Sequence, residues 1–443
     1  MILSPTILAS LSVFALLLLL AAGVPIFVSL GVVGLVGIGL LSGFSTAFGM
    51  LREVPYAANA EYLYLVIPLF VLMGHFAFYA GITNQAFDIG RKWFSKMPAG
   101  LALATICACA FMGAACGSSV AASATMGKIA LPEMLKKGYN RQFAAGCVAA
   151  GGLLAIIIPP SVILVLYAVI TNTSVGACLV GGFIPGIITT IVFMIGISTM
   201  LHFNPSLAPP TESFTWKERF VSLKGVWGIV LLFAIVIGGM GFGVFTPVEA
   251  AAGGVVCALL MLLFKPGRKG IAGEIAGEIK ESMIDTVRTS VFIFIIMICA
   301  GLYSNFLVRA GAGEAISMVI TNLQIPPIFV VIAALLVYLP LGCFLDPASC
   351  LLITLPILYP IIVTHLGFNP IWFGILVTKM IEIGLLTPPV GLNVFTIAGV
   401  APEIPVEEVF RGAGIFILFE SVTIVLLLAF PILTTWLPTL IMK

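Results

Sequence analysis

The chain has 443 residues, of which 61% are hydrophobic and only 9% charged, and its formal net charge is +2. With a mean hydropathy of +1.23, this composition lies outside the range of soluble globular proteins and indicates an integral membrane protein. The small net charge argues against a nucleic-acid partner, and at roughly 20 residues per span the chain has room for on the order of a dozen membrane crossings.

The first predicted spans cover about 7–22, 24–42 and 61–82, and the first two together are too long for a cleavable signal peptide. The next apolar segment, 99–131, is too long for one span. Basic residues flank it at Arg91, Lys92 and Lys96 on one side and at Lys128, Lys136, Lys137 and Arg141 on the other. Basic clusters mark cytoplasmic loops, so both ends of the segment lie on the same side. We therefore predict a re-entrant hairpin that enters from the cytoplasmic face.

The hairpin tip is predicted at GAACGSSVAAS, residues 113–123, which contains no Leu, Ile, Phe or Met. A chain can turn at membrane depth only where protein or water surrounds it, and small residues let two half-helices approach closely. We therefore expect Gly117, Ser118 and Ser119 to form the tip.

The segment that follows, 142–171, reads as a span interrupted by Pro159 and Pro160. Two successive prolines remove two backbone donors, so the helix is expected to break near the middle of the membrane. A simple kink is the alternative for any one such site. A further span at 175–200 completes this half, and the polar, proline-rich segment 202–225 is predicted to be an amphipathic cytoplasmic linker.

The second half repeats this order of elements. Spans are predicted near 226–243, 247–264 and 290–308, followed by an overlong segment, 327–363, whose flanking loops have almost no basic residues. This segment predicts a hairpin from the periplasmic side. The span that follows, 370–400, is interrupted by a second Pro-Pro pair.

One constant shift along the sequence lays Gly113 on Gly342, Pro159 on Pro388 and Pro160 on Pro389. The halves 1–201 and 226–443 therefore predict an inverted-topology repeat, a pattern typical of secondary transporters. The predicted fold class is an all-α polytopic membrane protein with two re-entrant hairpins and two Pro-Pro-broken helices.

The interrupted helices would offer amide-rich ends suited to an anion and free carbonyls suited to Na⁺. Asp346 weighs most among the side chains, because an acid at the membrane centre is costly and suggests a functional site; a structural partner for a buried donor is the alternative. A hard cation fits these oxygens better than a transition metal. The candidate side-chain oxygens are those of Ser118, Ser119, Ser161, Asp346, Thr387 and Asn393.

Other polar residues are less specific. Lys379 and Glu382 share a predicted helix and form either a self-neutralising pair or part of a substrate or ion site. Glu249 is expected to support a helix start, and His75 to be a packed hydrogen-bonding residue. The nine cysteines are interpreted as small packing residues, and no phosphate-binding loop is present.

Three runs resemble a known family: GAACGSSVAASATMGKIALPEMLKKGYNRQFAAG, IIIPPSVILVLYAVITNTSVGACLVGGFIPG and GLLTPPVGLNVFTIAGVA. They are similar to the large membrane subunit, of the DctM or SiaM type, of tripartite ATP-independent periplasmic (TRAP) transporters. The resemblance implies an elevator-type, Na⁺-coupled importer of carboxylates such as C4-dicarboxylates, sialic acids and keto acids. It also implies a separate four-span membrane subunit, a periplasmic binding protein that delivers the substrate, and a bacterial inner membrane location. The predicted crossings place both termini on the periplasmic side.

The resemblance further implies the positions of the sites. One Na⁺ site would lie between the first tip and the first break, and a second one between the second tip and the second break. The anionic substrate would lie between the tips, near Ser118, Ser119, Asp346 and Asn393. The implied Na⁺ site residues are Gly117, Ser118, Ser119, Ile158, Pro159, Pro160 and Ser161, and then Gly342, Asp346, Pro347, Thr387, Pro388 and Pro389.

Three alternatives remain at this stage. A stand-alone divalent-anion/Na⁺ symporter would need neither partner. An intramembrane serine protease would need His75 as a base beside Ser118 or Ser119. A non-transporting anchor subunit would not need broken helices.

Overall fold

A computed structural model describes most of the chain, and the described part contains helices and no strand. The predicted linker lies partly outside it. The described residues are 4–57, 59–209, 214–225, 227–265, 272–315, 318 and 325–442.

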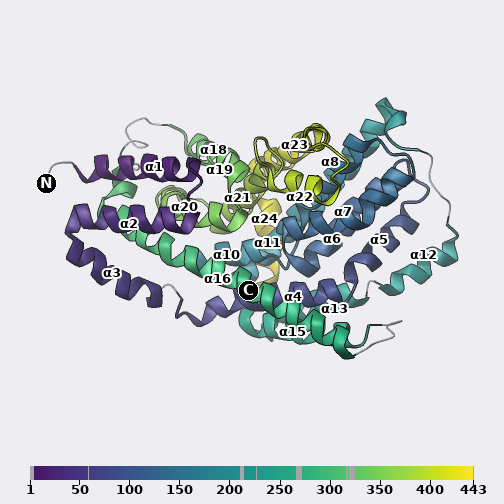
Figure 1. Ribbon diagram of the computed structural model, residues 1–443, viewed down its shortest axis with the longest axis horizontal. Coiled ribbons are helices and arrows are strands. Elements are labelled where there is room, and N and C mark those ends of the chain that lie inside the picture. The colour runs from purple at the N-terminus through teal and green to yellow at the C-terminus, as the bar shows by residue number, and fades with distance from the viewer. Residues whose placement is uncertain are drawn as a thin grey trace.

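Within the described residues, six helices are long and apolar enough to cross a membrane, and two bent helix pairs raise this number to eight. Five shorter apolar helices of 10–17 residues accompany them. Figure 1 shows α1 to α3 at one end of the long axis, α5 and α12 at the other, and α10, α11, α21 and α24 at the centre.

The N-terminal helices expose apolar side chains on much of their surface, as expected for segments that face lipid. Two helices here were not expected. One is α3, and the other is the amphipathic α5, which buries Ile82, Ala86 and Phe87 against α6 and carries Arg91 and Lys92 in its last turn. The bounds are α1 (Pro5–Ala21), α2 (Ile26–Ser42), α3 (Phe44–Ala57), η1 (Tyr62–Leu65), α4 (Val66–Tyr79) and α5 (Ile82–Trp93).

The first hairpin and the first broken span follow. Only Gly117 and Ser118 separate α6 from α7, and these two helices contact each other. The helix that runs to Ile157 resumes at Val162 with a bend of 42°. The bounds are α6 (Gly100–Cys116), α7 (Ser119–Lys136), α8 (Arg141–Gly151), α9 (Leu154–Ile157), α10 (Val162–Ile170) and α11 (Val175–Phe203).

The middle of the chain differs most from expectation. Glu249 closes a capping box with Thr246 at the start of α15, so its structural interpretation is confirmed. The long helix α16 has 38 residues and begins at Ala272, well before the predicted span at 290–308, because its first turns are charged and escape an apolar-window criterion. The bounds are η2 (Pro205–Leu207), α12 (Trp216–Ser222), η3 (Leu223–Gly225), α13 (Trp227–Phe233), the π-helical η4 (Ala234–Gly238), α14 (Gly239–Gly241), α15 (Pro247–Leu263) and α16 (Ala272–Arg309).

The C-terminal part contains the second hairpin and the second broken span, followed by α23 and α24, which the sequence pattern did not single out. The 15 residues of α21 are nearly all buried, as are those of α8 and α10, so the core surrounds the broken spans. The bounds are α18 (Pro327–Leu336), α19 (Tyr338–Phe344), α20 (Pro347–Tyr359), the π-helical η5 (Pro360–His365), α21 (Pro370–Gly384), α22 (Leu392–Val400), α23 (Val406–Ala429) and α24 (Ile432–Ile441).

Positions that the constant shift between the halves makes equivalent have the same local structure. Asn140 caps the N-terminus of α8 and Asn369 caps that of α21. The ring pairs beside these caps stack alike: Tyr139 with Phe143, with centroids 6.4 Å apart, and Phe368 with Trp372, with centroids 5.2 Å apart. The two broken spans therefore begin in the same way.

Candidate functional site

The first tip is built by a glycine and a serine. Gly117 has a φ of +57°, which ends α6. Ser118 is the N-cap of α7, and its hydroxyl accepts a hydrogen bond from the Ala121 backbone N–H at 3.4 Å. The remaining amides of this first turn carry the positive partial charge of a helix N-terminus.

Small residues at this tip allow it to touch the first break. A Cβ at Gly117 would lie 3.0 Å from the Pro160 carbonyl oxygen and 3.1 Å from the Val162 nitrogen. One turn earlier, a Cβ at Gly113 would lie 2.9 Å from the Leu154 carbonyl oxygen. Bulky residues would push the hairpin away from the broken span.

We expect Gly117→Ala to destabilise the protein by about 2 kcal/mol, because it adds both a strained φ and a backbone contact. The matched control is Gly138→Ala, whose φ of +88° is also positive but whose Cβ would meet nothing within 4 Å. The control should lose only the conformational part, about 1 kcal/mol. Thermal unfolding in detergent measures both, and equal losses would contradict the contact with the break.

The second tip uses an acid in place of the serine cap. Asp346 is the N-cap of α20, and its Oδ2 accepts hydrogen bonds from the backbone N–H groups of Ala348 at 3.1 Å and Ser349 at 3.2 Å. Its Oδ1 accepts from the Ser349 hydroxyl. Asp346 therefore does act as a structural partner for hydrogen-bond donors, which was the alternative considered for it. The same side chain also lines the cavity described below.

The second hairpin contacts the second break just as the first hairpin contacts the first break. A Cβ at Gly342 would lie 3.0 Å from the Cα of Gly384, and the Gly391 backbone N–H donates to the Cys343 carbonyl at 3.1 Å. Under the shift between the halves, Gly342 and Gly384 are the counterparts of Gly113 and Ala155, a pair that also packs closely. Each hairpin is thus seated on the broken span of its own half.

Both tips line one cavity of about 520 Å³. The first tip contributes residues 117–121, the start of α10 contributes Val162 and Ile163, and the second tip contributes residues 346–348. The N-termini of α7, α10 and α20 therefore converge on this space. Together they favour an anion there.

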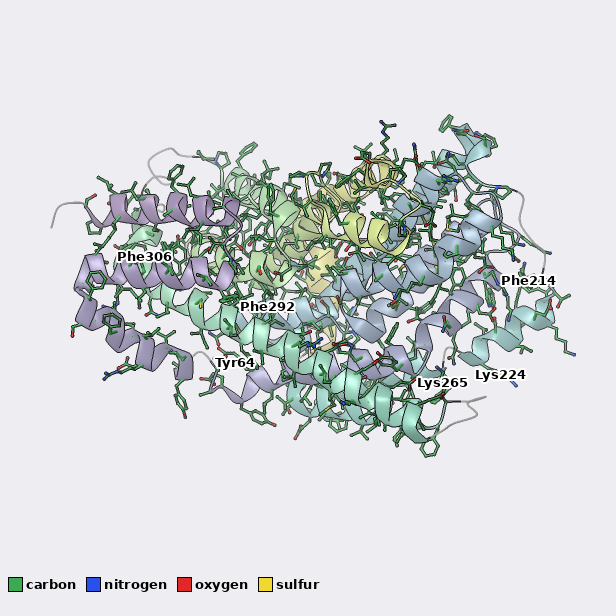
Figure 2. The ribbon with its side chains drawn as sticks, viewed as in Figure 1. Tyr64, Phe214, Lys224, Lys265, Phe292 and Phe306 are labelled. Atoms are coloured by element: carbon green, nitrogen blue, oxygen red, sulfur yellow. The ribbon has the colours of Figure 1, made fainter. Side chains whose placement is uncertain are left out.

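The opposite wall comes from α4 and α16. It includes His75 and Tyr79 from α4, and Asp285, Thr289 and Phe292 from α16; Phe292 is labelled in Figure 2. The sequence analysis assigned His75 to packing and began the predicted span near residue 290, so Asp285 fell outside it. The i, i+4, i+7, i+8 spacing of 285, 289, 292 and 293 was the signal that all four share one helix face.

The predicted site residues divide into two groups. Gly117, Ser118, Ser119, Asp346 and Pro347 line the cavity. The break residues behind the tips differ in exposure: Pro159, Pro160 and Ser161 are buried, whereas Pro388 and Pro389 are exposed. The predicted residues that are not part of the lining are Ile158, Pro159, Pro160, Ser161, Gly342, Thr387, Pro388, Pro389 and Asn393.

Asn393 lies behind the first tip and joins the two halves. Its side-chain amide nitrogen donates to the Ser119 Oγ at 2.5 Å and to the Ala149 carbonyl oxygen at 3.1 Å. The residue is fully buried, and its Oδ1 has no hydrogen-bond partner among the described residues. A buried amide oxygen without a donor calls for a partner that the described residues do not supply.

The donor chemistry around the tips fits Na⁺. Pro159 and Pro160 lack the N–H groups that would otherwise bond the carbonyls of Ala155 and Ile156, and Ile156 lines the cavity. The other oxygens that could bind a cation are hydroxyls, the Asp346 carboxylate and the unpartnered Asn393 Oδ1. These are hard oxygen ligands of the kind that alkali and alkaline-earth cations prefer.

A buried charge cluster lies outside the cavity. The Lys379 Nζ is 2.5 Å from Glu382 Oε2 and 2.7 Å from Glu420 Oε1, and all three side chains are fully buried. The sequence analysis paired Lys379 with Glu382 but missed Glu420, which comes from α23. The cluster links α21 to α23.

One known protein family matches nearly the whole chain. The family model described as "Tripartite ATP-independent periplasmic transporter, DctM component" matches residues 13–433. The chain is 33% identical to the C4-dicarboxylate TRAP transporter large permease protein DctM of Pseudomonas aeruginosa, over 86% of each chain. It is 31% identical to the DctM of the same description from Vibrio cholerae, over 96% of each chain. The Sialic acid TRAP transporter large permease protein SiaM of Vibrio cholerae is 29% identical, over 97% of this chain and 98% of that protein.

Two solved structures have a similar fold. The YdaH transporter of Alcanivorax borkumensis aligns with a TM-score of 0.57 at 13% identity, over 96% of this chain and 98% of that chain. MtrF of Neisseria gonorrhoeae aligns with a TM-score of 0.58 at 14% identity, over 97% of this chain and 95% of that chain. At these identities the likeness concerns the fold alone.

Proposed function

We propose, from the premise that this chain belongs to the family of DctM components of TRAP transporters, that it imports an organic carboxylate by coupling to Na⁺. The chain is a transporter large permease. The names of its relatives support a C4-dicarboxylate, sialic acid or related acid as the substrate class.

The observation that carries the proposal is the cavity between the two tips. Three helix N-termini converge on it, and each contributes roughly half a positive charge. A carboxylate group placed there would accept hydrogen bonds from backbone amides, and the Ser118 and Ser119 hydroxyls would lie beside it. The apolar side chains of the wall from α4 and α16, among them Val71, Phe78 and Phe292, would enclose the carbon skeleton.

Asp346 explains why a cation belongs in the same proposal. Its carboxylate lines the cavity, and its negative charge would oppose an anionic substrate. Na⁺ held by the tip residues and the break carbonyls would offset the charge of Asp346, so that less negative charge opposes the substrate. Inward movement of one net positive charge is favoured by about 2.3 kcal/mol per 100 mV of an inside-negative membrane potential.

The family implies two partners, which are part of the proposal. A small four-span membrane subunit would accompany this chain, and a periplasmic binding protein would deliver the substrate. Both termini would lie on the periplasmic side of a bacterial inner membrane.

The test is uptake of radiolabelled carboxylates into proteoliposomes, with and without an inward Na⁺ gradient. The small subunit and the binding protein are added separately. We expect uptake to need the gradient and both partners. Uptake by this chain alone would identify a stand-alone symporter, and uptake of none of the acids would refute the proposal.

Variants of the tips sharpen the test. Ser119→Ala and Asp346→Asn should each lower uptake by roughly 10-fold or more, because the first removes a hydroxyl and the second a negative charge from the cavity wall. Ser198→Ala is the control, since this hydroxyl bonds the Met194 carbonyl on α11, away from the tips. Unchanged uptake in both tip variants, with normal folding, would separate the cavity from the transport path.

A further inference from the structure

Another cavity, of about 440 Å³, opens between α13, α15 and the junction of α4 with α5. Its lining is almost wholly apolar, with Gln85 as its polar exception apart from the Cys257 thiol. Several of its side chains are strongly exposed, with values of 56% for Trp227, 48% for Leu260 and 77% for Phe264. We name this space the α13–α15 groove.

The groove is elongated. Its lining on the α13 side runs from Trp227 to Ile235, and on α15 from Gly253 to Phe264. At 1.5 Å per residue these stretches are about 12 and 16 Å long. An apolar lining of this length can contact a large part of an extended hydrocarbon chain.

Two lysines lie at one end of the groove. The helix α13 begins at Trp227 and α15 ends just before Phe264, so Lys224 and Lys265 both stand at the same end; Figure 2 labels both. A Cβ at Gly81 would lie 3.2 Å from the Lys265 Nζ, and one at Gly225 would lie 3.1 Å from the Gln85 Cβ. Gly81 and Gln85 are one helical turn apart, so the Lys265 ammonium and the backbone directly after Lys224 both lie beside the start of α5.

Neither lysine forms an ion pair with another described residue. Lys224 is exposed, and Lys265 donates to the Tyr79 carbonyl oxygen at 3.1 Å. The nearby Glu281 carboxylate accepts the Tyr79 hydroxyl at 2.8 Å. The ammonium groups thus keep donors for a further anion.

Residue types that are common at membrane interfaces lie near the same end. Trp216 and Phe220 of α12 are 60% and 59% exposed, beside Lys217 and Lys224, a mixture typical of interfacial segments. Basic pockets between transmembrane helices on the cytoplasmic side are suited to acidic lipid headgroups.

We propose that the α13–α15 groove binds one acyl chain of an anionic phospholipid whose phosphate group is held by Lys224 and Lys265. The groove supplies the apolar contact, and the two lysines select an acidic headgroup over a zwitterionic one. Another protein subunit could also cover an exposed apolar groove, but it would not require the paired cations at its end.

The experiment is native mass spectrometry of the purified full-length chain in detergent, titrated with phosphatidylglycerol or phosphatidylcholine. We expect selective, saturable binding of one phosphatidylglycerol. The double variant Lys224→Ala/Lys265→Ala should weaken this binding by roughly 30-fold. The matched control, Lys96→Ala/Lys128→Ala, removes two exposed lysines distant from the groove lining and should leave it unchanged.

A second variant tests the groove itself. Leu260→Trp fills the groove and should abolish phosphatidylglycerol binding there, whereas Leu336→Trp, at a similarly exposed site outside it, should not. Equal retention of the two lipids in the wild-type chain would overturn the proposal. The proposal would also be overturned if Leu260→Trp left phosphatidylglycerol binding unchanged but prevented association of the small membrane subunit. The groove would then be a site for that subunit.

Discussion

A Lys379→Met variant should lose about 3–5 kcal/mol of stability, the largest effect we expect from any single side-chain replacement here. The substitution removes the only cation that contacts Glu382 and Glu420 in the described structure and leaves two carboxylates in a fully buried site. Neither carboxylate can reach water without unpacking α21 from α23. Thermal unfolding and size-exclusion profiles in detergent measure the loss.

Glu382→Gln is the matched control for this cluster. With all three groups ionised the cluster carries two negative charges and one positive charge, so removing one carboxylate charge leaves the Lys379–Glu420 pair balanced. We expect Glu382→Gln to be far milder than Lys379→Met. If Glu382→Gln lost more stability than Lys379→Met, the buried lysine, and not the second carboxylate, would be the group whose burial destabilises the fold.

A Gly412→Ala variant should be destabilised by about 3 kcal/mol through a single methyl group. A Cβ at Gly412 would lie 1.8 Å from the Gln142 carbonyl oxygen, and one at Gly146 would lie 2.1 Å from the Gly412 carbonyl carbon. Both clashes are with backbone, so α8 and α23 would have to separate along their contact. This separation would also loosen the first broken span, which begins in α8.

The control lies slightly further along the same helix. A Cβ at Gly414 meets nothing within 4 Å, so Gly414→Ala should gain up to about 1 kcal/mol from helix propensity. The two alanine variants are therefore expected to have opposite signs in the same unfolding assay. If both were stabilising, the close contact of α8 with α23 would be contradicted.

The features that could be predicted from the sequence are those that depend on local residues. GAACGSS can form a tight turn because it lacks bulk, and a Pro-Pro pair breaks a helix wherever it occurs. The fold class and the family followed from these motifs. The roles of the individual site residues remain predictions.

The features that could not be predicted depend on contacts between distant segments. Asn393 was placed beside the substrate, yet it is buried behind Ser119, 274 residues away in sequence. Glu420 was overlooked because nothing in its local sequence indicates a partner on α21. His75 and Asp285 line the cavity because α4 and α16 pack beside the tips, and this packing cannot be inferred from the local sequence of either helix.

The length of α16 also locates the cavity along the membrane normal. Its 38 residues extend about 57 Å, nearly twice the roughly 30 Å of a hydrocarbon layer. From Ser290 to Val308 this helix has no charged residue, whereas its charges before that point include Asp285 and Arg288. Asp285 comes five residues before Ser290, so it lies about 7 Å outside the uncharged stretch. If this stretch crosses the hydrocarbon layer, Asp285 is at the membrane–water interface. Since Asp285 is part of the cavity wall, the cavity extends along α16 past the end of the uncharged stretch, toward the charged first turns of this helix.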